Sequence, residues 1–274
     1  MQDFKGFGKI VMDKDINKIY STTKRAWNDN WKPHEIERVM EIFTYPRVKK
    51  QVEFFEKYLP KKERILEGGC GLGPYLLYFH KKGYKITGID YNQDPLDKIK
   101  KYDSTVNVQT MDVKDLKFDD ASFGGYLSLG VIEHFSEGPE KSIEEASRVL
   151  KNGGVFIVQV PIMNLFLMLK YPWELLKRNK FTRRILKKPQ KHYYWQQYFK
   201  AGRLKYILEK RGFKVLEIRP MDHEHNIIST FGFLRDKSSY DGASDMGIKM
   251  SEFCEKYLRW PTAANMVLIC KKEN

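Results

Sequence analysis

The feature that most constrains this chain is a glycine-rich stretch at residues 67–74, Glu-Gly-Gly-Cys-Gly-Leu-Gly-Pro, which follows the apolar pair Ile65-Leu66. An apolar run, a glycine-rich break and a second apolar run at 75–79 predict a buried strand, a tight turn and an amphipathic helix. Glycine lets the backbone adopt positive φ and lets a ligand lie against the main chain. Pro74 suits the first helical position, where no amide hydrogen is required. The stretch therefore predicts a ligand-binding strand–turn–helix unit.

Two known phosphate-binding motifs do not fit this turn. The dinucleotide fingerprint has its third glycine five positions after the first, where this chain has Pro74, and a P-loop requires Gly-Lys-Ser/Thr. A second predicted strand, residues 84–90, ends in Asp90. That acid follows the turn by about twenty residues, the spacing at which a carboxylate reaches a ribose diol. The pair of motifs indicates a cofactor that contains a nucleoside.

Further motifs follow in a fixed order, at residues 106–113, 123–135, 147–161, 204–208, 211–215 and 266–272. Together with the glycine turn and Asp90, they resemble the class I S-adenosylmethionine-dependent methyltransferases. The resemblance implies an α/β fold, a Rossmann-like seven-stranded mostly parallel sheet with helices on both faces. It also implies an N-terminal helical cap over 1–61 and a methyltransferase domain over 62–274, with insertions at 162–201 and 221–262.

The resemblance implies S-adenosylmethionine as the cofactor, its ribose bound by Asp90 and its adenine by Asp112 and the amide of Val113. The cofactor-binding residues that it implies are Glu67, Gly68, Gly69, Gly71, Gly73, Asp90, Tyr91, Met111, Asp112, Val113 and Leu129. Each of these also has a purely structural explanation when taken alone, since glycines shape turns and acids often end strands at the surface. The motifs occurring in order favour the functional interpretation.

Methyl transfer to a hydroxyl or amine requires a group that takes the acceptor's proton, ideally with a pKa near neutrality. His134, which follows the predicted fourth strand, is the first candidate for this base, and Glu133 and His192 come next. A carboxylate acceptor would need no base, and His134 would then only shape the pocket.

The N-terminal region contributes apolar positions at helical spacing over 36–43 and 48–59, which predict two helices hinged near Pro46. Three aromatic residues precede them, Tyr20, Trp27 and Trp31. In the family that the chain resembles, such N-terminal pieces commonly fold over the cofactor. These aromatic residues are therefore either walls of the site or simple packing contacts between helices.

Positive charge is concentrated in one part of the chain. The formal net charge is +14, and residues 175–208 contain eleven Lys or Arg and no acid. Such a run predicts an anionic partner. An apolar stretch at 165–176 comes first, an order that favours an anionic membrane surface. Nucleic acid is the alternative partner, because the aromatic residues of 192–199 could stack on its bases. The same residues could instead line the acceptor pocket or pack internally.

Cysteine and histidine spacing gives no metal prediction. The three cysteines lie far apart, and His223 and His225 have no evident third ligand nearby. Residues 1–20 do not resemble a secretory signal, and no apolar run reaches the roughly 18 residues of a membrane span. We expect a cytoplasmic protein with peripheral contact to the membrane surface.

The acceptor is the least constrained element. The loop at 130–133 lacks the Asn/Asp-Pro-Pro-Tyr/Phe motif of nucleobase amino-methyltransferases and the Pro-Cys of cytosine C5 enzymes. The leading hypothesis is methyl transfer to an oxygen or nitrogen of a small-molecule, glycan or lipid-linked, anionic acceptor. The alternatives are an RNA methyltransferase that binds phosphates through the basic segment, and a non-catalytic cofactor-binding module.

Overall fold

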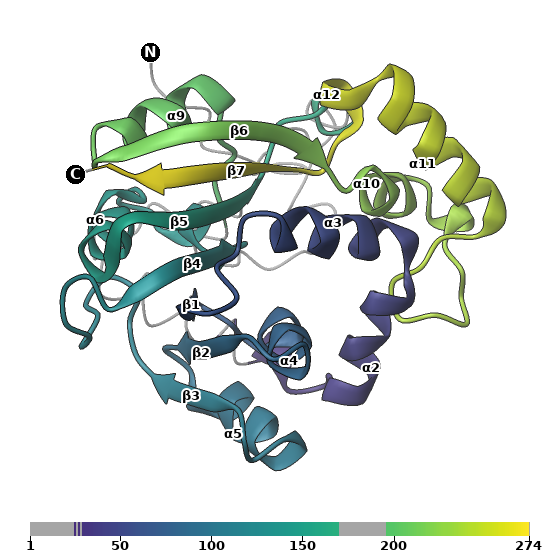
Figure 1. Ribbon diagram of the computed structural model, residues 1–274. Helices are drawn as coiled ribbons and strands as arrows, with labels where there is room; N and C mark the ends of the chain where they lie inside the picture. The colour runs from purple at the N-terminus through teal and green to yellow at the C-terminus, as the bar shows by residue number, and fades with distance from the viewer. Residues whose placement is uncertain (1–24, 26, 28, 170–195, 274) are drawn as a thin grey trace, which may run out of the picture.

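A single seven-stranded sheet organises the computed structural model, which describes residues 25, 27, 29–169 and 196–273 (Figure 1). The strand order is β3-β2-β1-β4-β5-β7-β6. β7 pairs antiparallel with β5 and β6, and the other neighbours pair in parallel. The strands are β1 (Arg64–Gly68), β2 (Lys85–Asp90), β3 (Asn107–Thr110), β4 (Phe123–Leu129), β5 (Leu150–Pro161), β6 (Phe213–Met221) and β7 (Asn265–Lys272). The predicted fold class is confirmed.

Helices cover both faces of the sheet. The helices are α2 (Ile36–Met40), η1 (Glu41–Thr44), α3 (Pro46–Glu56), α4 (Pro74–Lys81), α5 (Gln93–Tyr102), η2 (Ile132–His134), α6 (Glu140–Val149), α9 (Ala201–Glu209), α10 (His223–Thr230), η3 (Gly232–Leu234), α11 (Asp245–Tyr257) and α12 (Arg259–Thr262). α2 to α5 contribute to one buried cluster, and α6 and α9 contribute to the other. The central strands are buried on both sides, as is usual for parallel sheets.

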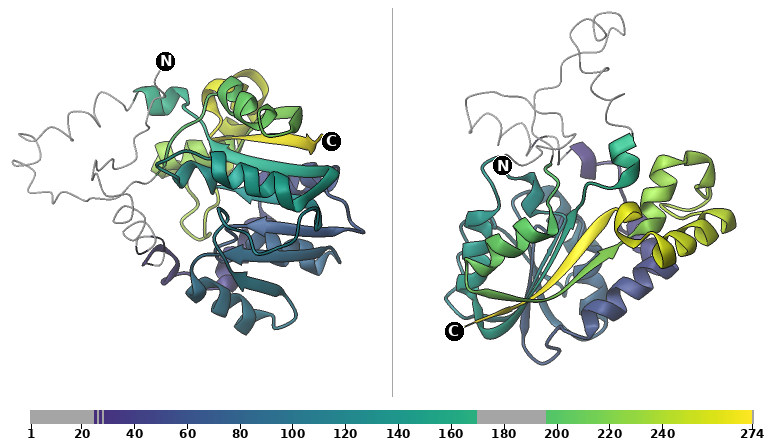
Figure 2. Two further views of the ribbon diagram at one scale, coloured as in Figure 1. Left: turned by 90° about the vertical axis from the view of Figure 1, so that its left-hand side faces the viewer. Right: turned by 90° about the horizontal axis from the view of Figure 1, so that it is seen from above.

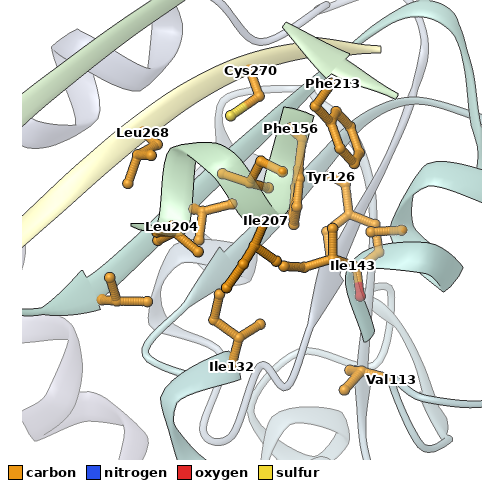
Figure 3. Packing of buried hydrophobic residues seen from close by; sticks show 14 of the residues in the cluster. Val113, Tyr126, Ile132, Ile143, Phe156, Leu204, Ile207, Phe213, Leu268 and Cys270 are labelled. Carbon is orange, nitrogen blue, oxygen red and sulfur yellow. The ribbon is translucent and has the colours of Figure 1, made fainter. Parts of the chain in front are cut away.

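Figure 3 shows how α9 closes the second of these clusters. Leu204 and Ile207 point from this helix toward Phe156 and Leu268 on the sheet, and all four side chains are almost completely buried. Phe213, at the start of β6, lies with its ring centroid 5.0 Å from that of Phe156. The last core helix that the sequence predicted is therefore part of the main core.

The N-terminal helices join at Pro46, as the sequence predicted. Tyr45 is extended, and α3 begins at Pro46, which fills the first helical position. From this helix, Arg47 reaches the second insertion. Its guanidinium bonds to Asp222 at 3.0 Å, Glu224 at 3.2 Å and Asp241 at 2.8 Å.

The second insertion, between β6 and β7, is helical rather than an extended loop (Figure 2). In the structure α11 begins at Asp245, because the Ser244 hydroxyl caps it by accepting a hydrogen bond from the amide of Gly247 at 3.3 Å. Within the described ranges, none of the helices combines the length and apolar content needed to cross a membrane.

Candidate cofactor and active site

The turn after β1 has the geometry that its glycines predict. Gly69, Gly71 and Gly73 all have positive φ, between 54° and 71°. A Cβ on Gly69 would lie 2.7 Å from Val131, and one on Gly71 would lie 2.9 Å from the Trp31 ring. Only glycine fits these two positions, because both the backbone conformation and the space exclude a side chain.

Asp90 is fixed at the carboxyl end of β2. One carboxylate oxygen accepts from the amide of Gly71 and the other from the amide of Asn92, both at 2.9 Å. The amides of Gly69 and Cys70 donate to the carbonyl of Ile89 at 2.7 and 2.9 Å. The glycine turn and the end of β2 therefore form one hydrogen-bonded unit with the acid at its centre.

A pocket opens beside this unit, along the carboxyl ends of β1, β2 and β4. It is lined by Trp27, Trp31, Gly69, Asp90, Tyr91, Asn92, Met111, Asp112, Val113, Gly130, Val131, His134, Phe135, Ser136 and Glu137. Segments that are far apart in sequence thus converge on one cavity. This edge of a parallel sheet is where open α/β folds bind ligands.

Six of the predicted cofactor residues line the pocket, namely Gly69, Asp90, Tyr91, Met111, Asp112 and Val113. Gly68 and Leu129 end strands β1 and β4. Gly71 lies under Trp31, and Gly73 precedes α4 as its N-cap. These four residues belong to the segments that form the pocket, but they are not among the residues that line it.

Glu67, also predicted, is buried at the end of β1 behind the glycine turn. Burial raises the pKa of its carboxyl to about 8, although a hydrogen bond from the Leu76 amide opposes the shift. Its Oε2 atom has no hydrogen-bond partner in the described part of the chain. The end of β1 therefore places an acceptor or, when protonated, a donor below the turn.

Two tryptophans form the outer wall. The rings of Trp27 and Trp31 stack with centroids 5.3 Å apart, and Trp27 meets the ring of His134 edge-on at 4.8 Å. Of the two explanations that the sequence left open, the structure agrees with the first, because both rings line the pocket. Tyr20, which was grouped with them, lies outside the described residues.

The loop after β4 brings together two of the three predicted catalytic residues. His134 lines the pocket, and its Nε2 lies 3.7 Å from Oε1 of the buried Glu133. Burial raises the pKa of the Glu133 carboxyl to about 8. The carbonyl of Glu133 accepts from the amide of Gln197 at 2.9 Å, which connects this loop to the chain that precedes α9. His192, the third candidate, lies outside the described residues.

Sequence reasoning did not identify six lining residues, which are Asn92, Gly130, Val131, Phe135, Ser136 and Glu137. All of them follow the ends of β2 or β4. The rule that ligands bind beyond the carboxyl ends of parallel strands could have found them. Of the aromatic residues at 192–199, Phe199 packs in the core. His223 and His225 lie on α10 and bond to Thr262 and Asp241.

The residues of the pocket fit S-adenosylmethionine. The Nδ2 of Asn92 is buried and has no hydrogen-bond partner among the described residues, and Asn92 lines the pocket together with Asp90, to which its main-chain amide donates. A donor next to an acceptor suits a ribose diol, which both donates and accepts. Val131, Phe135 and Val113 provide apolar surface near Asp112, which suits a purine with an exocyclic amine.

Comparison with known proteins agrees with this fit. Residues 66–158 match the family model described as methyltransferase domain. An uncharacterised protein of Methanocaldococcus jannaschii is 34% identical over 133 residues, which cover 48% of this chain and 60% of that protein. A ubiquinone biosynthesis O-methyltransferase of Coxiella burnetii is 22% identical over 238 residues, covering 83% of this chain and 93% of the relative.

Solved structures share the fold. A SAM-dependent methyltransferase from Archaeoglobus fulgidus superposes with a TM-score of 0.55 at 19% identity, covering 85% of this chain and 97% of that one. A second, from Methanosarcina mazei, gives 0.55 at 17% identity, with 84% and 98% coverage. The chain spans 60% or less of several of the curated relatives that it matches. Residues 66–158 therefore match a methyltransferase domain, and the fold is the one shared by solved S-adenosylmethionine-dependent methyltransferases.

Proposed function

We propose that this protein transfers a methyl group from S-adenosylmethionine to an oxygen or nitrogen of a small-molecule, glycan or lipid-linked acceptor that carries negative charge. The observation that supports this most directly is His134, an imidazole on the wall of a largely apolar cofactor pocket. When bound, the cofactor supplies a methyl group activated by a sulfonium. The residues of this chain orient the acceptor, exclude water and take its proton.

His134 is the proposed base. Its ring is held between Trp27, at 4.8 Å between ring centroids, and Glu133, at 3.7 Å between Nε2 and Oε1. An imidazole in this position can accept a proton from an acceptor hydroxyl or amine. Glu133 keeps its own proton near neutral pH, since burial raises its pKa to about 8. It therefore positions the imidazole as a neutral neighbour.

The names of relatives support a small acceptor. The Coxiella burnetii relative is named an O-methyltransferase of ubiquinone biosynthesis. A rice relative, 30% identical over 115 residues, is named a 2-methyl-6-phytyl-1,4-hydroquinone methyltransferase. Both names point to small molecules, and the second describes a ring with a long hydrocarbon tail. A lipid-linked acceptor is consistent with these names.

The test is transfer of label from methyl-labelled S-adenosylmethionine to a cell extract, which is then fractionated. We expect counts in the organic or low-molecular-weight fraction. The Asp90→Ala variant, whose cofactor site is damaged, is the control for non-enzymatic labelling. Counts that disappear with nuclease would instead identify an RNA methyltransferase. No counts from a protein that binds the cofactor would indicate a non-catalytic module.

A further inference from the structure

The exposed apolar side chains of this protein are concentrated on its two insertions. Nine of the eleven large hydrophobic side chains that are exposed in the described ranges lie there, and the other two are Tyr206 and Leu216. The nine, here called the insertion patch, are Leu165, Met168, Leu169, Phe233, Met246, Phe253, Tyr257, Leu258 and Trp260. Apolar residues gathered in this way on a water-soluble surface usually mark an interaction site.

The two insertions are one unit. Phe166, from the start of the first insertion, contacts Phe231 of the second, with ring centroids 5.5 Å apart. Both rings, with Met250, pack against a small buried cluster of Ile227, Leu234 and Cys254. Phe166 therefore lies against the same cluster as α10, η3 and α11, and the exposed residues of the patch come from both insertions.

Helix α11 carries an apolar stripe with two lysines beside it. Met246, Phe253 and Tyr257, with the half-buried Met250 among them, follow at intervals of four, three and four residues, which places them in one stripe. Lys249 and Lys256, at four and three residues from Phe253, flank the stripe. Of the three acids of this helix, Asp245 lies exposed in the first turn, whereas Glu252 and Glu255 line the cavity between α11 and α3, where Glu255 pairs with Lys50 at 3.0 Å.

We propose that the insertion patch binds the surface of an anionic lipid membrane. An apolar stripe flanked by lysines is the pattern of a helix that lies in the headgroup boundary, and Tyr257 and Trp260 are residue types enriched there. The charge of the chain agrees, because residues 170–208, which follow directly after Leu169, contain twelve Lys or Arg and one acid. Basic residues near such a surface contribute about 1 kcal/mol each.

The position of the patch relates it to the cofactor pocket. β6 runs parallel to β5, so both insertions leave the sheet at the carboxyl edge, where the pocket opens. A membrane bound at this edge would bring lipid-soluble compounds to the pocket side of the protein. The inference goes beyond the proposed function, and it does not depend on the identity of the acceptor.

The test is co-flotation of the full-length protein with vesicles of phosphatidylcholine alone or mixed with phosphatidylglycerol. We expect binding to the anionic vesicles that weakens with salt. The double variant Met246→Ser/Phe253→Ser should reduce this binding about tenfold, since each side chain loses apolar contact with the lipid. Tyr206→Ser on α9, which removes an equally exposed aromatic outside the patch, is the matched control and should bind as the wild type does.

Three results would overturn the proposal. The first is that the wild type does not float with the vesicles, and the second is that the double variant floats as well as the wild type. The third is that neither protein binds vesicles, while the wild type is a dimer and the double variant a monomer. The third result would assign the patch to an interface between two copies. Unchanged melting temperature and unchanged S-adenosylmethionine affinity in the double variant would show that the loss of flotation does not reflect misfolding.

Discussion

The ammonium group of Lys98 on α5 lies 2.8 Å from the main-chain carbonyl oxygen of His34. It also donates to the carbonyls of Lys32 at 2.9 Å and Trp31 at 3.2 Å. Trp31 in turn covers Gly71 and stacks on Trp27. One cation therefore fastens the aromatic wall over the cofactor pocket.

Replacing Lys98 with Met should weaken S-adenosylmethionine binding about five- to tenfold. Hydrogen bonds of a charged group contribute about 1.5–3 kcal/mol when buried, and partial exposure of Lys98 reduces that value. Calorimetry and tryptophan fluorescence would measure the effect. Lys100→Met, on the same helix but bonded only to the nearby Ser104 carbonyl, should bind normally. Equal binding by both variants would contradict this role of Lys98.

Asp90→Ala should weaken S-adenosylmethionine binding tenfold or more, because it removes the carboxylate that we propose forms charge-assisted hydrogen bonds with the ribose. Asp90→Asn should be nearly as damaging. Both carboxylate oxygens accept from amides, those of Gly71 and Asn92, so an Asn side chain must turn its NH₂ group against one of these donors. Calorimetry that showed unchanged affinity for the alanine variant would refute the ribose role.

The ligand-free protein should lose stability as the pH rises. Burial raises the pKa of Glu67 from its ordinary value of 4.5 to about 8, so the folded protein holds this proton more tightly than the unfolded chain does. The resulting stabilisation is complete below pH 4.5 and is lost as the pH rises toward 8, by up to about 1.4 kcal/mol per pH unit.

Denaturant unfolding between pH 5.5 and 8 would measure this slope. Glu67→Gln should make it shallower without abolishing it, since a neutral amide replaces one titrating carboxyl while the buried Glu133 keeps the other. Glu63→Gln, a change at an exposed acid, should keep the wild-type slope. An unaltered slope in Glu67→Gln would mean that Glu67 is ionised in the folded protein near neutral pH.

His134→Ala should lower kcat by roughly 10²–10⁴ if the acceptor is a hydroxyl or amine, the usual contribution of general base catalysis. The cofactor affinity should change much less, which calorimetry would check separately from turnover. Added imidazole should restore part of the activity. A kcat within a fewfold of the wild type would exclude His134 as the base and favour a carboxylate acceptor.

Arg47→Met should destabilise the protein by about 3–5 kcal/mol, because it leaves Asp222, Glu224 and Asp241 close together without their shared cation. Lys50→Met removes the ion pair with Glu255, which is about half exposed on both sides, and should cost about 1 kcal/mol or less. Denaturant titration of the two variants would compare them. Similar losses would show that the Arg47 cluster is no stronger than a surface pair.

The sheet and the glycine turn could be predicted because their signals are local. Positive φ at Gly69, an acid at the end of β2 and Pro74 at the start of α4 each depend on a few neighbouring residues. The order of these motifs was then sufficient to indicate a seven-stranded, mostly parallel sheet. The tryptophan wall was also visible, although only as one of two explanations for Trp27 and Trp31.

Other features depend on contacts between distant parts of the chain. Arg47 meets acids 175 to 194 positions away, and nothing in its local sequence identifies them. The sequence around Lys98 does not distinguish it from an ordinary solvent-exposed lysine. Its role depends on the main-chain carbonyls of residues 31, 32 and 34, which only the fold brings next to it. The start of α11 is by contrast a local feature, because the Ser244 hydroxyl caps the helix.

The contact between Phe166 and Phe231 has a consequence for protein engineering. The buried residues of this cluster all belong to the second insertion, and Phe166 of the first packs against them, so the two insertions are not independent modules. Deleting one of them, or grafting one onto a related methyltransferase, would remove the contact between Phe166 and Phe231 and expose apolar side chains to water. Both insertions would therefore have to be transferred together to a methyltransferase scaffold that lacks them.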